Sequence, residues 1–241
     1  MPLPTISTPT YELKLPSNGK KIKFRPFLVR EEKILILALE SQESSNITNA
    51  VKDVLQKCIL TRGVKVESLP TFDIEYLFLN IRGKSIGESF NVVVTCPDDN
   101  ETTVSQTIFV DEIEMVRPEG HTPDVKLDND LTLRMKYPSM NQFIDKNFDT
   151  AMTPEESVEQ SFDAICECMD TIFSAEEAWD ASEYTKKEKM EFIEQLNSSQ
   201  YKQIETFFAT IPKLSYSFEV ENPKTGVKSP IVLEGLTDFF G

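Results

Sequence analysis

Residues 71–88 have the sequence TFDIEYLFLNIRGKSIGE, which predicts a helix that is apolar on more than one side. Four apolar side chains recur at i, i+3, i+4 and i+7, the spacing of a buried helical face; they are Ile74, Leu77, Phe78 and Ile81. Tyr76 and Leu79 are also apolar and point elsewhere. A helix of this kind is buried between layers of its own protein or against a partner.

The ends of this helix carry their own signals. Thr71 is the expected N-cap, and Asp73 lies in the first turn, where the helix dipole favours negative charge. Gly87 is expected to end the helix, and Arg82 and Lys84 lie near that end, where cations are favoured.

The composition is typical of an ordinary soluble globular protein. The 241 residues suit one large domain or two small ones, and the formal net charge is −15. Residues 1–120 carry 14 basic and 17 acidic side chains, whereas residues 121–241 carry 11 and 23. The acidic second half would repel phosphate backbones, so a nucleic-acid partner is not expected.

Neither a membrane span nor a secretion signal is expected. No apolar run approaches the roughly 20 residues that cross a bilayer. Residues 1–10, MPLPTISTPT, lack the charged and apolar regions of a signal peptide and predict an extended arm. Cys166 and Cys168 are two apart on a predicted helix and point away from each other, and Cys58 falls on an apolar helical face. These free cysteines fit a reducing compartment.

Alternation and helical periodicity predict an α+β fold made of β-hairpins and helices. Before residue 71 the expected elements are a hairpin at 11–15 and 20–24 and helices at 29–41 and 47–59. After residue 88 they are strands at 90–95 and 102–110, a hairpin at 125–127 and 131–137, helices at 140–144, 153–173, 185–196 and 198–211, and a closing hairpin at 214–221 and 228–233. Residues 112–116 suit a short helix or strand, and residues 174–184 are predicted to be mobile.

Two of the expected hairpins resemble each other. Phe90, Val92, Val94, Cys96 and Pro97 match Tyr216, Phe218, Val220, Asn222 and Pro223 in order and spacing. On the return strands, Ile108 matches Ile231, so the first turn is three residues longer. The pattern indicates either two similar helices-then-hairpin halves or a coincidence. The expected organisation is an arm at 1–10, a first part at 11–117 and a second part at 118–241.

No pattern of catalytic or metal-binding residues is found. His121 is the only histidine, and it lies in a Pro/Gly loop. Cys96 begins a hairpin turn in which Asp98 and Asp99 stand where a zinc knuckle would need a second cysteine. Phosphate-binding glycine motifs and a nucleophile elbow are lacking. We therefore expect no cofactor, no metal and no enzymatic activity, although paired carboxylates leave a glycosidase open.

Two longer segments resemble a known family. Residues 11–33, YELKLPSNGKKIKFRPFLVREEK, and residues 69–88, with the pattern L-P-x-F-D-I-E-Y-L-F-L-x-I-R followed by K-S-x-G-E, are similar to the baseplate hub and hub-assembly proteins of T4-type contractile-tailed phages. Residues 136–139, KYPS, are similar as well. Relatives with a cysteine-bearing hairpin differ from this chain, which keeps only Cys96 there.

The resemblance implies a non-enzymatic role in building the baseplate hub through protein–protein contacts. Expected partners are other hub proteins and the tape-measure protein, in the host cytoplasm during assembly and in the virion if the protein stays there. The alternatives are a transient hub-assembly chaperone absent from the mature virion and, less favoured, a tail-associated cell-wall hydrolase. The residues predicted to contact a partner are Arg25, Phe27, Arg30, Glu31, Tyr76, Phe78, Arg82 and Lys84. Each also suits a local role as a helix-end ion pair or core aromatic.

Overall fold

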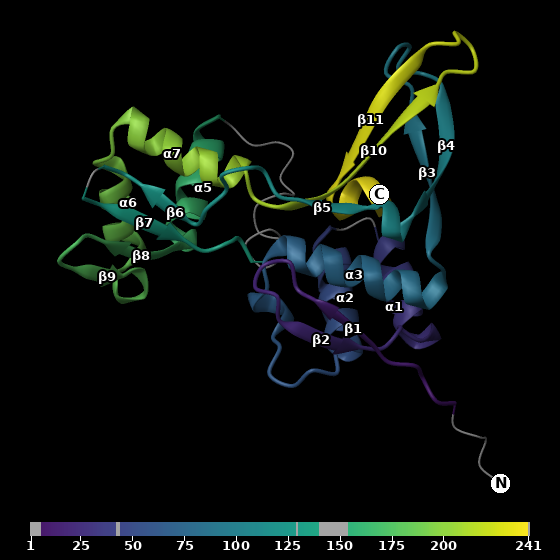
Figure 1. The fold of residues 1–241 in the computed structure, drawn as a ribbon, viewed down its shortest axis with the longest axis horizontal. Coiled ribbons are helices and arrows are strands. Elements are labelled where there is room, and N and C mark those ends of the chain that lie inside the picture. Colours follow the sequence, from purple (N-terminus) through teal and green to yellow (C-terminus); the bar gives the residue numbers. More distant parts are fainter. Residues whose placement is uncertain (1–5, 42–43, 129, 140–153, 241) are drawn as a thin grey trace. The chain divides into compact units, whose positions relative to one another are not determined.

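The chain folds into two compact units, shown in a computed structural model that describes residues 6–41, 44–128, 130–139 and 154–240 (Figure 1). Unit 1 comprises residues 1–116 and 213–241, and unit 2 comprises residues 117–212. The predicted parts, 11–117 and 118–241, place the closing hairpin with the second part, whereas the structure groups it with unit 1. The strands form several small antiparallel sheets, and the helices are separate from them in the chain order. The predicted α+β class is therefore confirmed.

Unit 1 begins with a hairpin and three helices, as predicted. Its elements in chain order are β1 (Tyr11–Lys14), β2 (Lys21–Phe24), α1 (Val29–Glu40), α2 (Ser44–Cys58), α3 (Thr71–Ile86), β3 (Ser89–Thr95), β4 (Thr103–Phe109), β5 (Glu114–Val116) and, after unit 2, β10 (Lys213–Glu221), β11 (Lys228–Glu234) and α8 (Gly235–Phe240). Short 3-10 turns at Val66–Ser68 and Val110–Glu112 complete it.

Helix α3 is the buried centre of unit 1. Ile74, Leu77 and Ile81 are buried on the predicted face. Leu79 is also buried, and it packs with half-buried Tyr76 in the core formed by the later hairpins. The protein's own strands therefore cover much of the second apolar face.

The start of α3 differs from the prediction. Pro70, not Thr71, is the N-cap, and its carbonyl oxygen accepts the N–H groups of Asp73 and Ile74 at 3.1 Å each. Pro70 has φ −54° and ψ 147°, and because this ψ lies outside the helical region, Thr71 is the first helical residue. The Asp73 carboxylate is buried and accepts hydrogen bonds from the Ser17 N–H (3.0 Å) and hydroxyl (2.5 Å). Asp73 thus fastens the β1–β2 turn to α3.

The two similar hairpins, β3–β4 and β10–β11, lie side by side and share one core (Figure 1). Their buried members are Phe90, Val92, Val94, Cys96, Ile108, Leu214, Val220 and Leu233. The tips are joined by hydrogen bonds: Asn222 donates to both Asp98 carboxylate oxygens at 3.0 Å, and the Thr225 hydroxyl donates at 2.6 Å. These bonds lower the pKa of Asp98, and the bond from Thr225 has the largest effect. We call this pair of hairpins the hairpin lobe.

The pairing register corrects the predicted alignment of the return strands. Phe90 pairs with Ile108, whereas the matching Tyr216 pairs with Leu233, not Ile231. The closing bonds run from Cys96 N–H to the Thr102 carbonyl and from Asn222 N–H to the Val227 carbonyl. Residues 97–101 therefore correspond to 223–226, and the first turn is one residue longer, not three. Spacing alone could not reveal which return residues face each other.

Unit 2 is a four-stranded antiparallel sheet with helices. Its elements are β6 (Asp124–Lys126), β7 (Thr132–Met135), α5 (Pro154–Cys168), β8 (Met169–Phe173), β9 (Ala178–Asp180), α6 (Lys186–Glu194) and α7 (Ser198–Ala209), with a 3-10 turn at Ala181–Glu183, and the strand order is β6-β7-β8-β9. Leu133, Met169, Ile193 and Ile204 are fully buried in its core. The predicted helix at 140–144 lies outside the described residues.

Two predictions in unit 2 are wrong. The helix expected to run to residue 173 ends at Cys168, and Met169–Phe173 forms β8. Ile172 pairs there with Leu133, so a partner distant in sequence overrides the continuing helical spacing. The segment expected to be mobile contains β9, in which Trp179 pairs with Ile172. The predicted capping box of Thr185 and Glu188 is confirmed.

His121 forms an aromatic stack inside unit 2. Its ring stacks on those of Tyr137 and Phe207 at interplanar angles of 27° and 25°, with centroids 5.6 and 5.5 Å away. The Nδ1 atom is 2.9 Å from the Thr210 hydroxyl, and Nε2 is 3.0 Å from the Tyr137 hydroxyl. Because the Thr210 hydroxyl donates to the Thr206 carbonyl, it accepts from Nδ1–H, and Nε2 is left to accept from Tyr137. Burial lowers the pKa of His121.

All four cysteines are buried and free of disulfides. Among the described residues, no helix is long and apolar enough to cross a membrane.

Candidate partner interface

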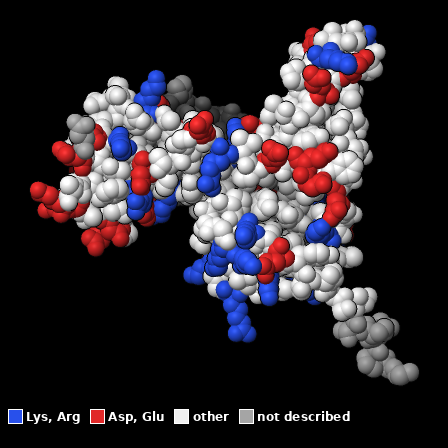
Figure 2. Space-filling view, in the orientation of Figure 1, with Lys and Arg blue, Asp and Glu red and all other residues white. Residues whose placement is uncertain are grey.

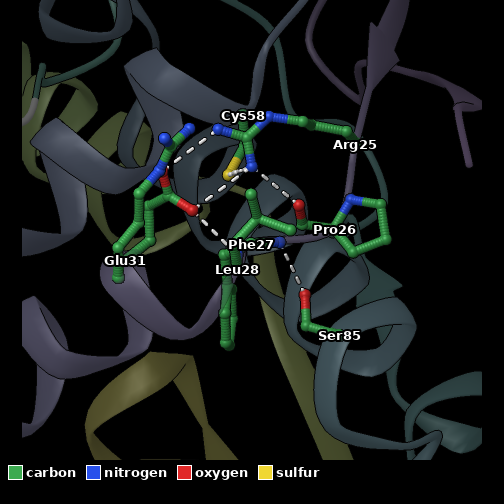
Figure 3. Close-up of polar contacts among 8 residues, drawn as sticks. Arg25, Pro26, Phe27, Leu28, Glu31, Cys58 and Ser85 are labelled. Carbon is green, nitrogen blue, oxygen red and sulfur yellow. Dashed lines mark hydrogen bonds and ion pairs between the residues drawn. The ribbon is translucent and has the colours of Figure 1, made fainter. Parts of the chain in front are cut away.

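A charged network joins the end of β2 to the start of α1 (Figure 3). Arg25 follows β2, and its guanidinium donates to both carboxylate oxygens of Glu31 at 3.2 and 3.3 Å. The Arg30 Nε donates to Glu31 Oε1 at 2.7 Å, and the Leu28 N–H donates to Oε2 at 2.7 Å. Arg25 also reaches the Pro26 carbonyl oxygen at 2.9 Å. Glu31 therefore orders the chain that enters α1.

Burial and hydrogen bonding oppose each other at Glu31. The side chain is 1% exposed, and this desolvation raises its pKa, but hydrogen bonds from Arg25, Arg30 and Leu28 outweigh it. The resulting pKa is about 2, so Glu31 is ionised at neutral pH. The neighbouring Cys58 thiol has its pKa raised to about 11 by burial, which leaves it a protonated, unreactive core residue.

An open pocket of about 440 Å³ borders this network. Its lining residues are Arg25, Arg30, Glu31, Ile34 and Lys57. Three cations thus face one carboxylate, and Lys57 makes no ion pair within the described parts of the chain. The pocket carries an excess of positive charge, which suits an acidic group of a partner.

Phe27 connects this region to α3. Its side chain is buried, and its N–H donates to the Ser85 hydroxyl at 2.9 Å. Ser85 in turn donates to the Ile81 carbonyl oxygen at 2.5 Å. Phe27 is therefore an anchor of the α1 start rather than an exposed contact.

The predicted α3 residues lie in different surroundings. Phe78 is buried, and Tyr76 is half-buried against the hairpin lobe. The half-buried Arg82 guanidinium lies 4.9 Å from the Phe90 ring centroid, and burial lowers its pKa. Lys84 forms an ion pair with Glu88 and lies 5.5 Å from the Tyr11 ring centroid.

The structure brings together only some of the eight predicted residues. Arg25, Arg30 and Glu31 form one cluster, whereas Tyr76 and Arg82 contact the hairpin lobe. Exposure is concentrated in two of them, because the side chains of Arg30 and Lys84 are 73% and 38% accessible. These two side chains reach solvent, and the other six are buried or half-buried.

Sequence reasoning missed the outer face of α1. Val29, Ile36 and Leu37 are 79%, 49% and 55% exposed, and their i, i+7 and i+8 spacing puts them on one side of the helix. We call these three residues the α1 face. The signal was present in the sequence, because the block from Ile34 to Leu39 holds more apolar residues than one buried face needs.

An exposed aliphatic helix face and a positively charged pocket are therefore the two features of unit 1 that would suit contact with another macromolecule. The described residues contain no group of three or more His, Cys, Asp or Glu side chains that could hold a metal ion. A family model described as T4 bacteriophage base plate protein matches residues 8–241, so the chain belongs to that family. No curated protein and no solved structure is detectably similar. Membership implies contacts with other baseplate proteins and a place in the tail baseplate.

Proposed function

We propose that this protein works in the central hub of the baseplate, as a non-enzymatic subunit or assembly factor that acts through protein–protein contacts. Its partners are other hub proteins and the tape-measure protein, met in the host cytoplasm while the contractile tail is assembled. The family match supports a baseplate role, and the α1 face is the observation that carries the contact role.

The α1 face is large enough to matter energetically. Burying one Val, Ile or Leu side chain is worth roughly 1.5–3 kcal/mol, so three exposed side chains represent several kcal/mol of unused burial. Val29 lies about two turns of α1 before Ile36 and Leu37. This spacing suits a partner that presents a groove or an amphipathic helix. The pocket with Arg30 and Lys57 adjoins this helix and adds a charged anchor.

The predicted contact residues have two roles in this proposal. Arg30 and Lys84 reach a partner, because their side chains are exposed. The other six hold the surface in place: Arg25, Phe27, Glu31, Tyr76, Phe78 and Arg82. Charge reversal at Arg82 would set a carboxylate against the Phe90 ring, so a folding measurement must accompany that variant.

The test uses a phage that lacks this gene and is complemented with variants. Val29→Gln, Ile36→Gln and Leu37→Gln together keep a good helix former at each position and remove the α1 face. Electron microscopy of the lysates should show tails lost, while the purified variant keeps its circular dichroism and melting temperature. The matched control is Val93→Thr with Val232→Thr, which removes two valines that are 70% and 54% exposed on the hairpin lobe. Normal tail numbers with the triple variant would contradict the proposal.

An exposed aliphatic helix face is equally what a transient hub-assembly chaperone offers to a partner helix. Mass spectrometry of purified virions separates the two roles. A hub subunit should be detected in stoichiometric amounts, whereas a chaperone should be missing from the finished particle.

A further inference from the structure

Unit 1 carries a basic face in a protein that is acidic as a whole. Five exposed cations form it, on the β1–β2 hairpin and the chain beside it: Lys14, Lys20, Lys21, Lys23 and Arg62. Figure 2 shows Lys and Arg side chains gathered over the part of unit 1 that holds β1 and β2. Within the described residues, the one ion pair made by these five joins Lys21 to Glu12 at 3.1 Å.

The fold concentrates these charges. Lys14 and Lys21 are directly opposite each other in the β1–β2 pairing, an arrangement that costs stability because like charges repel. The Leu60 N–H donates to the Lys23 carbonyl, and the Lys23 N–H donates to the Thr61 hydroxyl, both at 2.8 Å. These bonds hold the chain after α2, with Arg62, beside the hairpin.

Unit 2 is strongly acidic. Residues 117–212 carry 9 basic and 20 acidic side chains, whereas residues 11–65 carry 11 basic and 6 acidic. The imbalance is strongest at residues 159–185, which contain eight acidic and no basic side chains. We call this range the acidic segment. Its Glu176 and Glu177 are exposed in the turn between β8 and β9.

We propose that the basic face binds the acidic segment of a second copy of this chain. The two surfaces differ, so the contact is head-to-tail, and copies joined this way form a ring or an open chain. A symmetric contact of basic face with basic face is disfavoured, because it would bring the like charges of both copies together. The contact is electrostatic and therefore sensitive to salt.

Sedimentation velocity of the full chain tests this contact. At about 20 mM NaCl the Debye length is roughly 20 Å, and at about 500 mM it is roughly 4 Å. The weight-average sedimentation coefficient should rise with protein concentration at low salt and stay at the monomer value at high salt. A monomer at every concentration at low salt would overturn the proposal.

Charge reversal locates the two surfaces. Lys14→Glu with Lys20→Glu should weaken the association at least tenfold, and it also relieves the Lys14–Lys21 repulsion, so the hairpin stays folded. Lys224→Glu with Lys228→Glu makes the same change in net charge on the hairpin lobe and should leave the association within about twofold, because distant surface charges are screened. If both double variants weakened the association equally, the effect would come from net charge alone, and the proposal would be overturned.

A mixing experiment tests the head-to-tail arrangement. Glu176→Lys with Glu177→Lys should likewise weaken self-association at least tenfold. Mixed with the Lys14→Glu, Lys20→Glu variant, it should form a 1:1 complex, since one intact basic face and one intact acidic segment remain. Failure of the mixture to associate would reject this contact. Retardation of duplex DNA by a chain that stays monomeric would assign the basic face to a phosphate backbone instead.

Discussion

Glu31 is a buried carboxylate that serves two arginines and one backbone N–H. A buried ion loses hydration, so it is retained only where its hydrogen-bonding sites are filled. The two carboxylate oxygens of Glu31 hold both arginine side chains and the backbone at the start of α1. The ionised form of Glu31 therefore stabilises unit 1.

Glu31→Gln is expected to lower the free energy of unfolding by about 3 kcal/mol. The pKa difference between the ordinary value of 4.5 and about 2 corresponds to this energy. Because the folded pKa is depressed, the stabilisation is present above pH 4.5 and is lost as the pH falls toward 2. Urea unfolding at pH 7 and pH 3 measures both effects. The neighbouring Glu32→Gln should change little, and equal losses for the two variants would contradict this role.

His121 should make unit 2 sensitive to mild acid. Its pKa is lowered by burial, so the neutral ring stabilises the fold above the ordinary pKa of 6.5. This stabilisation is lost as the pH falls through the lower folded pKa. The melting temperature should therefore drop between pH 7.5 and 5.5, and His121→Phe should flatten that change. An unchanged pH dependence in the variant would show that other groups cause it.

At this scale the sequence revealed local partners better than distant ones. The Thr185–Glu188 capping box was predictable, because both residues lie within one turn. The bond between Ser17 and Asp73 joins residues 56 apart, and no spacing rule connects them. For the same reason the polar residues around β2 and α1 could be named as candidates, but their burial could not be foreseen.

Helix α3 depends on one small residue where it meets the end of the hairpin lobe. Gly83 is buried, and a Cβ built on it would lie 3.2 Å from a Val110 methyl carbon. The close approach of α3 to the 3-10 turn at Val110–Glu112 therefore requires a side chain no larger than hydrogen or one that shifts its neighbour.

Gly83→Leu is expected to destabilise unit 1 by about 1–3 kcal/mol, the usual cost of overpacking a well-packed site. Guanidinium unfolding followed by circular dichroism measures it. Lys84→Leu provides the control on the adjacent exposed position and should stay within about 0.5 kcal/mol. If both variants were equally stable, the contact between α3 and Val110 would be loose.

Elements with a complete local pattern were predicted well. The helical stripe from Ile47 to Ile59 and the alternating strands of the hairpin lobe occur where expected. Strand β8 was missed because Met169, Ile172 and Phe173 also fit the spacing of the preceding helix, and pairing with β7 decides between the two structures. The α1 face was missed because an apolar residue in a helix is ordinarily assigned to the core.

The whole molecule is built by insertion. Strand β5 ends at Val116 and β10 begins at Lys213, and these two residues are directly paired. Residues 117–212, which form unit 2, are thus inserted in the sequence between two paired strands of unit 1 that a short hairpin turn could join. The expected division into two consecutive parts follows sequence order, which shows where elements are and not which of them pack together.

Replacing residues 117–212 by Asn-Gly is expected to give a folded unit 1. The β5–β10 pair and the hairpin-lobe core remain intact, and a two-residue turn of this type joins antiparallel strands. Dispersed amide signals in NMR and a cooperative melt would confirm it. A molten or insoluble product would mean that unit 1 needs unit 2 in order to fold.

The split core of the hairpin lobe has a consequence for synthesis on the ribosome. Phe90, Val92, Val94 and Ile108 are made early, but Leu214, Val220 and Leu233 come from the last part of the chain. At 5–20 residues per second, the first hairpin waits on the order of 10 s for its other half. Its apolar side faces water during that interval and is exposed to misassociation. Any truncated product that ends before residue 213 keeps that side uncovered permanently, which makes incomplete chains natural targets for proteolysis.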